Sequence, residues 1–218
     1  MEALKKLLKE FSEEVAGETR DYIEEVSKLV PTNSAPGVFD QMFKKWVVAS
    51  IANLYETGKN TNPNCLVLCG GQGMNKTSFF TSLFSPEYIF IGHIDLKNKD
   101  SMMMLSDTFI IVLDEQFSIL DKEKDWESLK SAITMPRVKA RWHYEKSSKV
   151  YSRIANFCGT TNRIEVLKGI TNNRRFVPFQ LTEPIDINSL EQIAIRKMWG
   201  QAYHLYQSGF EYKLRNGE

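Results

Sequence analysis

The chain has 218 residues, 42% of them hydrophobic and 25% charged, as in an ordinary soluble globular protein. Its 28 basic and 27 acidic residues leave a formal charge of +1, so a nucleic-acid site has to be a local basic patch. No apolar run approaches the roughly 20 residues that span a bilayer, and the charged, amphipathic start of the chain is unlike a secretory signal.

The first part of the chain is predicted to be helical. Apolar residues recur at helical spacing from Leu4 to Val15 and from Tyr22 to Val30, which predicts two short amphipathic helices within residues 1–35. Helices of this length are marginal alone, so we expect them to pack on another part of the chain. Residues 31–37 contain two prolines and a glycine and are predicted to be a linker.

The main domain is expected over residues 36–213, followed by a tail at 214–218. It begins with an amphipathic helix over about 39–54, after which predicted strands and helices alternate. We expect strands near 64–69, 88–91, 109–113, 154–160 and 176–181, and helices near 77–84, 99–106, 121–134 and 164–168. This alternation predicts an α/β fold, a largely parallel five-stranded sheet with helices on both faces.

Two further features complete the outline. A single long amphipathic helix is predicted from about Leu190 to Tyr206 and closed by Gly209. The three cysteines, Cys65, Cys69 and Cys158, lack metal-site spacing and fall in predicted strands. Buried, reduced thiols are typical of a cytoplasmic protein, which is the location that we expect.

A glycine-rich run follows the first predicted strand and precedes a helix, as in a phosphate-binding loop. Its residues, the expected nucleotide contacts, are Gly70, Gly71, Gln72, Gly73, Met74, Asn75, Lys76, Thr77 and Ser78. Backbone amides of such a loop hold polyphosphate oxygens, the lysine reaches the outer phosphates, and the threonine hydroxyl ligates Mg²⁺. The residue before Lys76 is Asn75 instead of the usual glycine, and Asn best tolerates the backbone angles required there. The run predicts binding of a nucleoside triphosphate.

Two acids end the third predicted strand, which reads Phe-Ile-Ile-Val-Leu before Asp114 and Glu115. In a parallel sheet this end of the strand opens into the ligand crevice. Asp114 is therefore expected to hold Mg²⁺ and Glu115 to polarise the attacking water. Buried strands followed by exposed acids are common, so the inference depends on the phosphate loop some forty residues upstream.

Three further polar residues are candidates for a role in hydrolysis of the nucleoside triphosphate. Asn162 follows the fourth strand, where it either orients water and senses the γ-phosphate or serves only as a turn residue. Arg174 and Arg175 precede the fifth strand. An outward arginine near a subunit boundary can stabilise the transition state of a neighbour's phosphoryl transfer, although a solvated strand edge has the same pattern.

A basic hairpin is predicted between residues 137 and 153. The expected nucleic-acid contacts are Arg137, Lys139, Arg141, His143, Lys146, Lys149 and Arg153. Glu145 is the only acidic residue between positions 137 and 153. Strict alternation places the first four cations on one face of a strand, and the second strand is expected to resume a polar face. Cations beside aromatic residues suit a phosphodiester backbone with stacked bases, and a plain solvated hairpin is the alternative.

The combination of motifs resembles the virulence-associated protein E family, the helicase-like ATPases of phage, plasmid and genomic-island replication proteins. The resemblance covers about residues 38–212 and leaves residues 1–35 outside. The matching stretches are Trp46 to Tyr55, Gly70 to Phe80, Asp107 to Glu115, Phe157 to Arg163, and Asn173 to Phe176.

This resemblance implies an AAA+-like core related to superfamily 3 helicases, with ATP and Mg²⁺ bound between subunits of a homo-oligomeric ring such as a hexamer. It implies single-stranded DNA in the central channel against the basic hairpin, and often a primase module as a partner. Lys76 would bind phosphate, Asn162 would be the sensor, and Arg174 or Arg175 would be the finger acting across the interface.

The function predicted is therefore an ATP-dependent DNA helicase or translocase. Asn75 keeps a second class open, a nucleotide-dependent DNA-binding or assembly module with little hydrolysis. A small-molecule kinase is disfavoured, because a projecting cationic hairpin is not the substrate lid that such an enzyme needs.

Overall fold

The computed structural model describes residues 1–59, 62–95, 98–120, 122–140, 147–168 and 174–213. A five-stranded parallel sheet lies at the centre of this part, with the strand order β2-β3-β6-β1-β7. Its strands are β1 (Cys65–Cys69), β2 (Ile89–Gly92), β3 (Ile110–Asp114), β6 (Asn156–Thr161) and β7 (Phe176–Gln180). A separate antiparallel pair consists of β4 (Arg137–Ala140) and β5 (Lys149–Ser152).

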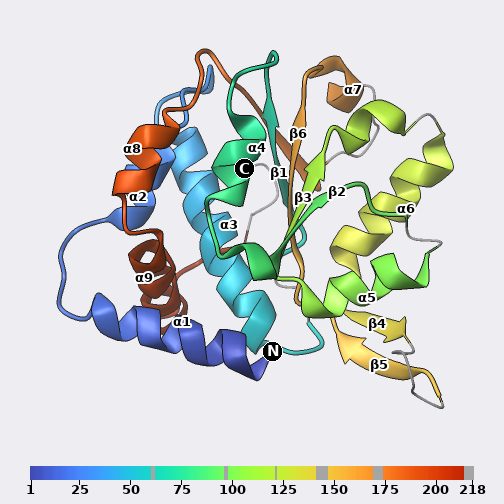
Figure 1. Ribbon diagram of the computed structural model, residues 1–218, viewed down its shortest axis with the longest axis horizontal. Coiled ribbons are helices and arrows are strands. Elements are labelled where there is room, and N and C mark those ends of the chain that lie inside the picture. The colour runs from blue at the N-terminus through green and yellow to red at the C-terminus, as the bar shows by residue number, and fades with distance from the viewer. Residues whose placement is uncertain (60–61, 96–97, 121, 141–146, 169–173, 214–218) are drawn as a thin grey trace.

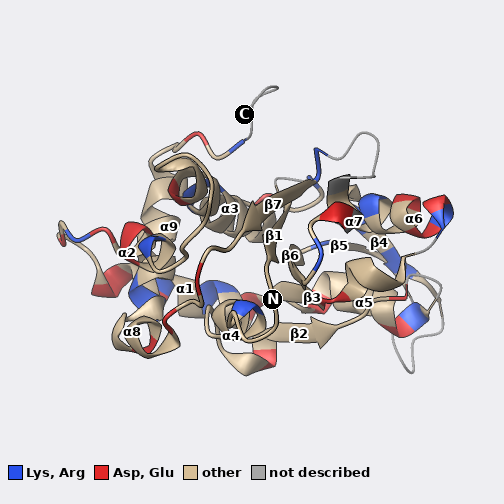
Figure 2. Cartoon of the chain, turned by 90° about the horizontal axis from the view of Figure 1, so that it is seen from above, with Lys and Arg blue, Asp and Glu red and all other residues tan. Residues whose placement is uncertain are grey.

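Helices cover both faces of the sheet (Figure 1). The α-helices are α1 (Glu2–Glu14), α2 (Tyr22–Lys28), α3 (Val38–Tyr55), α4 (Lys76–Thr81), α5 (Lys99–Asp107), α6 (Glu123–Thr134), α7 (Glu165–Lys168), α8 (Ile187–Gln192) and α9 (Ile195–Gln207). Two short 3-10 segments are η1 (Pro86–Tyr88) and η2 (Gln116–Ile119). Seen from above, α3, α8 and α9 lie on one side of the strands and α5, α6 and α7 on the other (Figure 2).

The strands are apolar on both faces because both faces are covered. All five residues of β1 are buried, and they alternate between two hydrophobic clusters. Leu66 and Leu68 join the cluster under α3 and α9, whereas Val67 points to the cluster under α5 and α6. The free thiols of Cys65 and Cys158 lie buried on opposite faces. The predicted fold class, a parallel five-stranded α/β sheet between helices, is confirmed.

The N-terminal helices pack on the rest of the chain, as expected from their length. The fully buried Leu4 and Leu8 place α1 against α9, and Ile23 and Val26 of α2 belong to the same hydrophobic cluster. The predicted linker is attached to the end of β7, because the amide of Asn33 donates to Gln180 O over 3.0 Å. No helix in the described ranges is both long and apolar enough to cross a membrane.

The prediction of one long C-terminal helix is wrong. The chain forms α8 and α9 instead, with extended or irregular backbone at Ile193 (φ −86°, ψ 131°) and Ala194 (φ −71°, ψ 82°). The break lets Leu190 pack beside α4 while Met198 packs against the inner helices. No glycine or proline marks this break, so tertiary packing overrides a continuous helical pattern.

The close approach of α1 and α9 depends on Gly200. A Cβ added at this buried glycine would lie 2.2 Å from Phe11 O, which is backbone and cannot move aside cheaply. We therefore expect Gly200→Ala to lower the free energy of unfolding by about 1–3 kcal/mol, as measured by urea denaturation. The control is Gly71→Ala, since Gly71 is exposed, its backbone lies outside the left-handed region, and a Cβ there meets nothing within 4 Å. An unchanged urea midpoint for Gly200→Ala relative to the wild type would refute the proposed close contact.

Candidate functional site

The carboxyl ends of β1, β3 and β6 meet at one edge of the sheet, where three of the predicted motifs lie. The glycine-rich loop 70–75 leaves β1, β3 ends at Asp114, and Asn162 directly follows β6. The residues around the loop differ in exposure: Gly70 and Lys76 are buried, Met74 and Thr77 are half-buried, and Gly71, Gln72, Gly73, Asn75 and Ser78 are exposed. In open parallel sheets, ligands bind at the carboxyl ends of the strands, and the exposed loop residues lie at this position.

Lys76 lies at the centre of this edge with its amine turned inward. Its Nζ donates to Gly70 O at 2.7 Å, to Gly71 O at 2.8 Å and to Asn162 Oδ1 at 2.9 Å. Burial lowers the pKa of the Lys76 amine, and the nearby carboxylates Glu115 and Asp114 partly oppose that shift. The amine is therefore held by its own loop and would have to leave two carbonyls to meet a phosphate.

Asp114 accepts hydrogen bonds from two hydroxyl groups. Thr77 Oγ1 and Thr160 Oγ1 each donate to Asp114 Oδ1 over 2.7 Å. A carboxylate and hydroxyls are the hard oxygen ligands that Mg²⁺ prefers. The described residues contain no cluster of three or more His, Cys, Asp or Glu suited to a metal. Asp114, Thr77 and Thr160 are the residues here that could hold Mg²⁺.

Glu115 adjoins this group in an unusual backbone conformation, with φ 51° and ψ 14°. Its carboxylate Oε2 accepts from the amide of Asn162 at 3.3 Å and from Ser118 Oγ at 3.3 Å. Left-handed backbone angles at a non-glycine residue are strained and concentrate at functional sites. Glu115 and Asn162, predicted separately from two strands, are therefore in direct contact.

A glycine and an asparagine give the loop its shape. Gly73 has φ 81°, which favours glycine, and Asn75 has φ 58° and ψ 23° directly before α4. Asn75 therefore adopts the left-handed conformation for which a glycine is usual at this position of the loop.

The basic hairpin forms, but its cations do not share one face. Cross-strand partners point to the same face of a sheet, and Lys139 is opposite Val150 whereas Lys149 is opposite Ala140. Arg137 and Lys139 are exposed on the outer face, and Val138 and Ala140 are buried on the inner one. Lys149 thus starts from the inner side, although it is exposed. The expected contacts Arg141, His143 and Lys146 lie outside the described residues.

The assignment of Arg153 to a nucleic-acid surface is wrong. Its side chain is 1% exposed, and its guanidinium donates to Met135 O at 2.9 Å, to Asn62 O at 3.2 Å and to Ala155 O. Burial lowers the pKa of this guanidinium to about 9. Arg153 comes two residues after the half-buried Tyr151 and therefore points to the same face of the strand. It turns into the protein and anchors the base of the hairpin.

Arg174 and Arg175 lie at the opposite end of the sheet from the phosphate loop. They precede β7, whose first residue pairs with Cys65 at the start of β1, about 16 Å of strand below the loop. Arg174 is exposed, and Arg175 is half-buried, with its Nε lacking a hydrogen-bond partner in the described part of the chain. Neither arginine can reach the nucleotide edge of its own chain.

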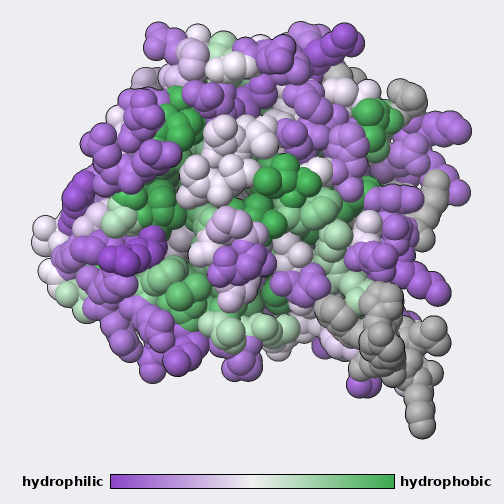
Figure 3. All heavy atoms as spheres, viewed as in Figure 1, coloured by the Kyte–Doolittle hydropathy of each residue, from purple (hydrophilic) through white to green (hydrophobic). Residues whose placement is uncertain are grey.

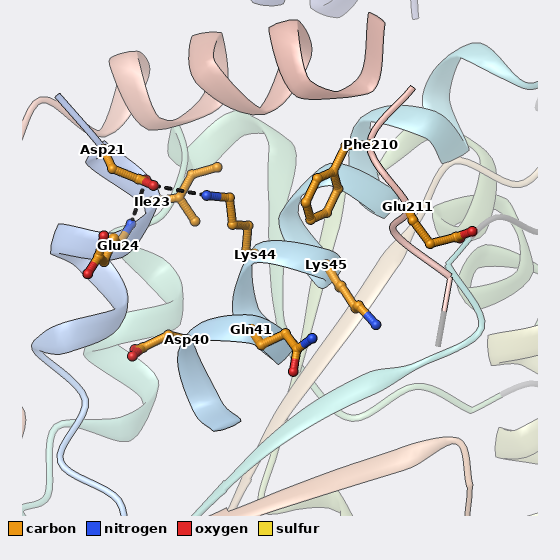
Figure 4. Close-up of a pocket in the computed structure, with 9 residues that line it drawn as sticks. All are labelled: Asp21, Ile23, Glu24, Asp40, Gln41, Lys44, Lys45, Phe210 and Glu211. Carbon is orange, nitrogen blue, oxygen red and sulfur yellow. Dashed lines mark hydrogen bonds and ion pairs between the residues drawn. The ribbon is translucent and has the colours of Figure 1, made fainter. Parts of the chain in front are cut away.

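A pocket of about 470 Å³ lies elsewhere, between α2, α3 and the segment after α9 (Figure 4). Its lining residues are Asp21, Ile23, Glu24, Asp40, Gln41, Lys44, Lys45, Phe210 and Glu211. Lys44 Nζ is paired with Asp21 Oδ2 at 2.9 Å, so the acids outnumber the available positive charge. This pocket is unsuited to polyphosphate and contains none of the predicted site residues.

Sequence reasoning assigned no role to two residues of the site. Thr160 bonds to Asp114, and the register of β3 and β6 places the two side by side. A hydroxyl inside a buried strand, two residues before Asn162, was the available signal. His93, which follows β2, places Nε2 2.9 Å from Asp114 O, and no local pattern marks it.

The parallel sheet, the glycine-rich loop with Lys76 and the acid at the end of β3 define a P-loop type α/β fold. The sequence profile of the virulence-associated protein E-like domain matches residues 13–218, and this chain belongs to that family. The match begins at residue 13 and so takes in α2, which the resemblance drawn from the sequence left outside.

Solved structures support the fold. The apo structure of the NrS-1 C-terminal region is similar with a TM-score of 0.58 and 17% identity, covering 90% of this chain and 47% of that one. Another apo form of the same region has a TM-score of 0.55 and 16% identity, covering 85% of this chain and 44% of that one. The chain thus spans about half the length of the solved structures that it matches. No curated protein sequence matches it.

Proposed function

We propose that this chain is the ATP-hydrolysing domain of a DNA helicase or translocase in a mobile-element replication protein. It would bind ATP and Mg²⁺ at the edge where loop 70–75, Asp114 and Asn162 meet, and single-stranded DNA at the hairpin β4–β5. The observation that carries the proposal is the convergence of three motifs at one edge of the sheet, where Lys76 Nζ donates to Asn162 Oδ1 and Thr77 Oγ1 donates to Asp114 Oδ1. Family membership agrees with this proposal.

The site residues would divide the work of hydrolysis. Loop amides bind the phosphates, and the amine of Lys76 leaves Gly70 O and Gly71 O to neutralise the outer phosphate oxygens. Glu115 turns from the amide of Asn162 to align and polarise the attacking water. Mg²⁺ held by Thr77 and Asp114 would supply Lewis-acid stabilisation of the developing charge.

The position of the arginines supports an assembly of several copies. Because Arg174 and Arg175 lie far from the nucleotide edge of their own chain, they could act only on the nucleotide of a neighbour. The edge strand β2 offers a surface for contact, with Ile91 49% exposed, and Ile119 beyond β3 is 53% exposed. Figure 3, in the orientation of Figure 1, shows apolar surface near the centre of the face on which β2 lies, with polar residues around it. The assembly that we propose is a homo-oligomeric ring, such as a hexamer, joined to a primase module.

One observation favours a second function. The carboxylate of Glu115 is bonded to Asn162 and Ser118, and the amine of Lys76 is bonded to its own loop, so both groups already have partners within the chain. A chain in which these bonds persist would bind ATP and DNA as an assembly module with little hydrolysis. Turnover in the presence of DNA separates the two functions.

The first experiment measures phosphate release with and without an oligothymidylate, for the wild type, Lys139→Ala and Lys149→Ala. The two lysines start from opposite faces of the hairpin, so loss of stimulation in only one variant identifies the face that contacts DNA. We expect the outer face to do so, with Lys139→Ala reducing the salt dependence of DNA binding by about one unit of log–log slope. Lys9→Ala, which removes an exposed cation from α1, is the matched control.

The outcomes separate the candidates. DNA-stimulated hydrolysis that is weakened by Lys139→Ala and unchanged by Lys9→Ala supports the motor. Binding of ATP and DNA without hydrolysis supports the assembly module. A wild-type chain that binds no ATP excludes both.

A further inference from the structure

The residue that departs from the phosphate-loop pattern makes a contact that a glycine could not make. Asn75 Nδ2 donates to Ile185 O over 2.9 Å. In return, the amide of Ile185 donates to Met74 O over 3.3 Å. These two hydrogen bonds, which we call the Asn75 clasp, join adjacent loop residues to one point 110 positions later in the chain.

Ile185 is well placed to hold the loop. It is 1% exposed and belongs to the hydrophobic cluster under α3 and α9. The segment that leads to it is itself fixed, because Leu181 N donates to Cys69 O at 2.8 Å and Thr182 N donates to Pro31 O at 2.9 Å. The clasp therefore joins the glycine-rich loop to an ordered segment.

The clasp lies immediately before α8. Asp186 caps this helix, with Oδ1 accepting from Ser189 N at 3.1 Å. Leu190 of α8 is fully buried, and α8 packs against α4, the helix that the loop itself begins. Beyond α8, the helix α9 packs on α1 and α3 (Figure 1). A movement of the loop is thus passed through Ile185 to the layer of helices on one face of the sheet.

We propose that Asn75 is a positioning residue that couples the phosphate loop to α8, so that nucleotide binding orders α8 and the helices packed on it. The inference rests on the nucleotide site proposed above. Phosphate oxygens fix the peptide groups of the loop when they bind its amides, and the clasp transmits that fixation to Ile185. Glycine at position 75 would allow the loop to bind phosphate without this effect.

The test is hydrogen–deuterium exchange of the full chain with and without Mg²⁺·ADP, for the wild type, Asn75→Gly and Asn75→Asp. In the wild type we expect ADP to slow exchange in α8 by at least about threefold. Asn75→Gly suits the backbone angles but has no side-chain donor, so it should bind ADP, and ADP should then make no difference to the rate of exchange in α8. Helix α5, on the other face of the sheet, is the internal control.

Asn75→Asp separates the hydrogen bond from the shape of the side chain. Aspartate has nearly the same shape as asparagine and also tolerates left-handed angles, but its carboxylate cannot donate to Ile185 O. We therefore expect faster exchange in α8 than in the wild type, for both variants and without nucleotide. This readout does not depend on phosphate binding, which the added negative charge would weaken.

The results distinguish two failures. If the wild type binds ADP and Asn75→Gly retains the same ADP-dependent protection of α8, the coupling role of Asn75 is wrong and the nucleotide site stands. If the wild type binds no ADP, the proposed function fails and the inference fails with it.

Discussion

Glu115→Gln is expected to lower the rate of ATP hydrolysis by at least about a hundredfold, the effect of removing a positioned general base. The amide side chain is nearly isosteric, and its oxygen can still accept from Asn162 N, so the loop and the Asp114 group should keep their arrangement. Nucleotide affinity should therefore stay within about threefold of the wild type, because only the transition state uses the carboxylate. Phosphate release and titration of a fluorescent ATP analogue measure the two quantities.

Glu87→Gln is the matched control, because it makes the same chemical change at an exposed acid of η1. It should hydrolyse ATP at the wild-type rate. If Glu115→Gln also retains full turnover, then Glu115 does not activate the water, and the bonds that it makes to Asn162 and Ser118 are structural. A joint loss of affinity and turnover would instead indicate a role in holding the loop.

Local sequence signals were sufficient for the sheet. Runs such as 65–69 and 110–113 are apolar at every position because both faces of a parallel strand are covered, and the acid at 114 marks where the strand leaves the core. The break between α8 and α9 was not predictable, since Ile193 and Ala194 continue the helical pattern and only packing against α4 and α1 separates the helices.

The site was predictable to the extent that each strand ends in its own motif. Lys76, Asp114 and Asn162 each lie at or shortly after the carboxyl end of a recognisable strand, and parallel topology brings the ends of those strands together. Predicting the contacts between strands would have required the register in which the strands pair. The bond from Thr160 to Asp114 and the bond from Asn75 to Ile185 join residues 46 and 110 positions apart, and no spacing rule connects them.

The hairpin illustrates how alternation alone can mislead. Period two correctly separates Arg137 and Lys139 from the buried Val138, but it does not relate one strand to the next. That relation depends on the register across the turn, which places Lys149 opposite Ala140. The same register turns Arg153 inward, so a basic residue that suggested a DNA contact is instead a buried donor.

Arg153→Met is expected to lower the free energy of unfolding by about 1–3 kcal/mol, the usual cost of leaving buried hydrogen-bond acceptors without their donor. Methionine fills a similar volume but leaves the carbonyls of Met135, Asn62 and Ala155 without the guanidinium donor. Arg153→Lys should lose less, because an ammonium group donates but cannot reach all three directions of the fork. Urea denaturation followed by tryptophan fluorescence measures both variants.

The control for this prediction is Arg196→Met on α9, where the guanidinium is exposed and pairs with Glu14 at 2.8 Å. Exposed pairs contribute about 0–1 kcal/mol, so this variant should unfold close to the wild type. Equal midpoints for Arg153→Met and Arg196→Met would mean that the buried guanidinium does not hold the base of the hairpin. A large difference would establish that β5 is anchored in the core directly before β6, the strand that ends at Asn162. A force on the hairpin would then be transmitted along β6 to the nucleotide edge, as the proposed motor requires.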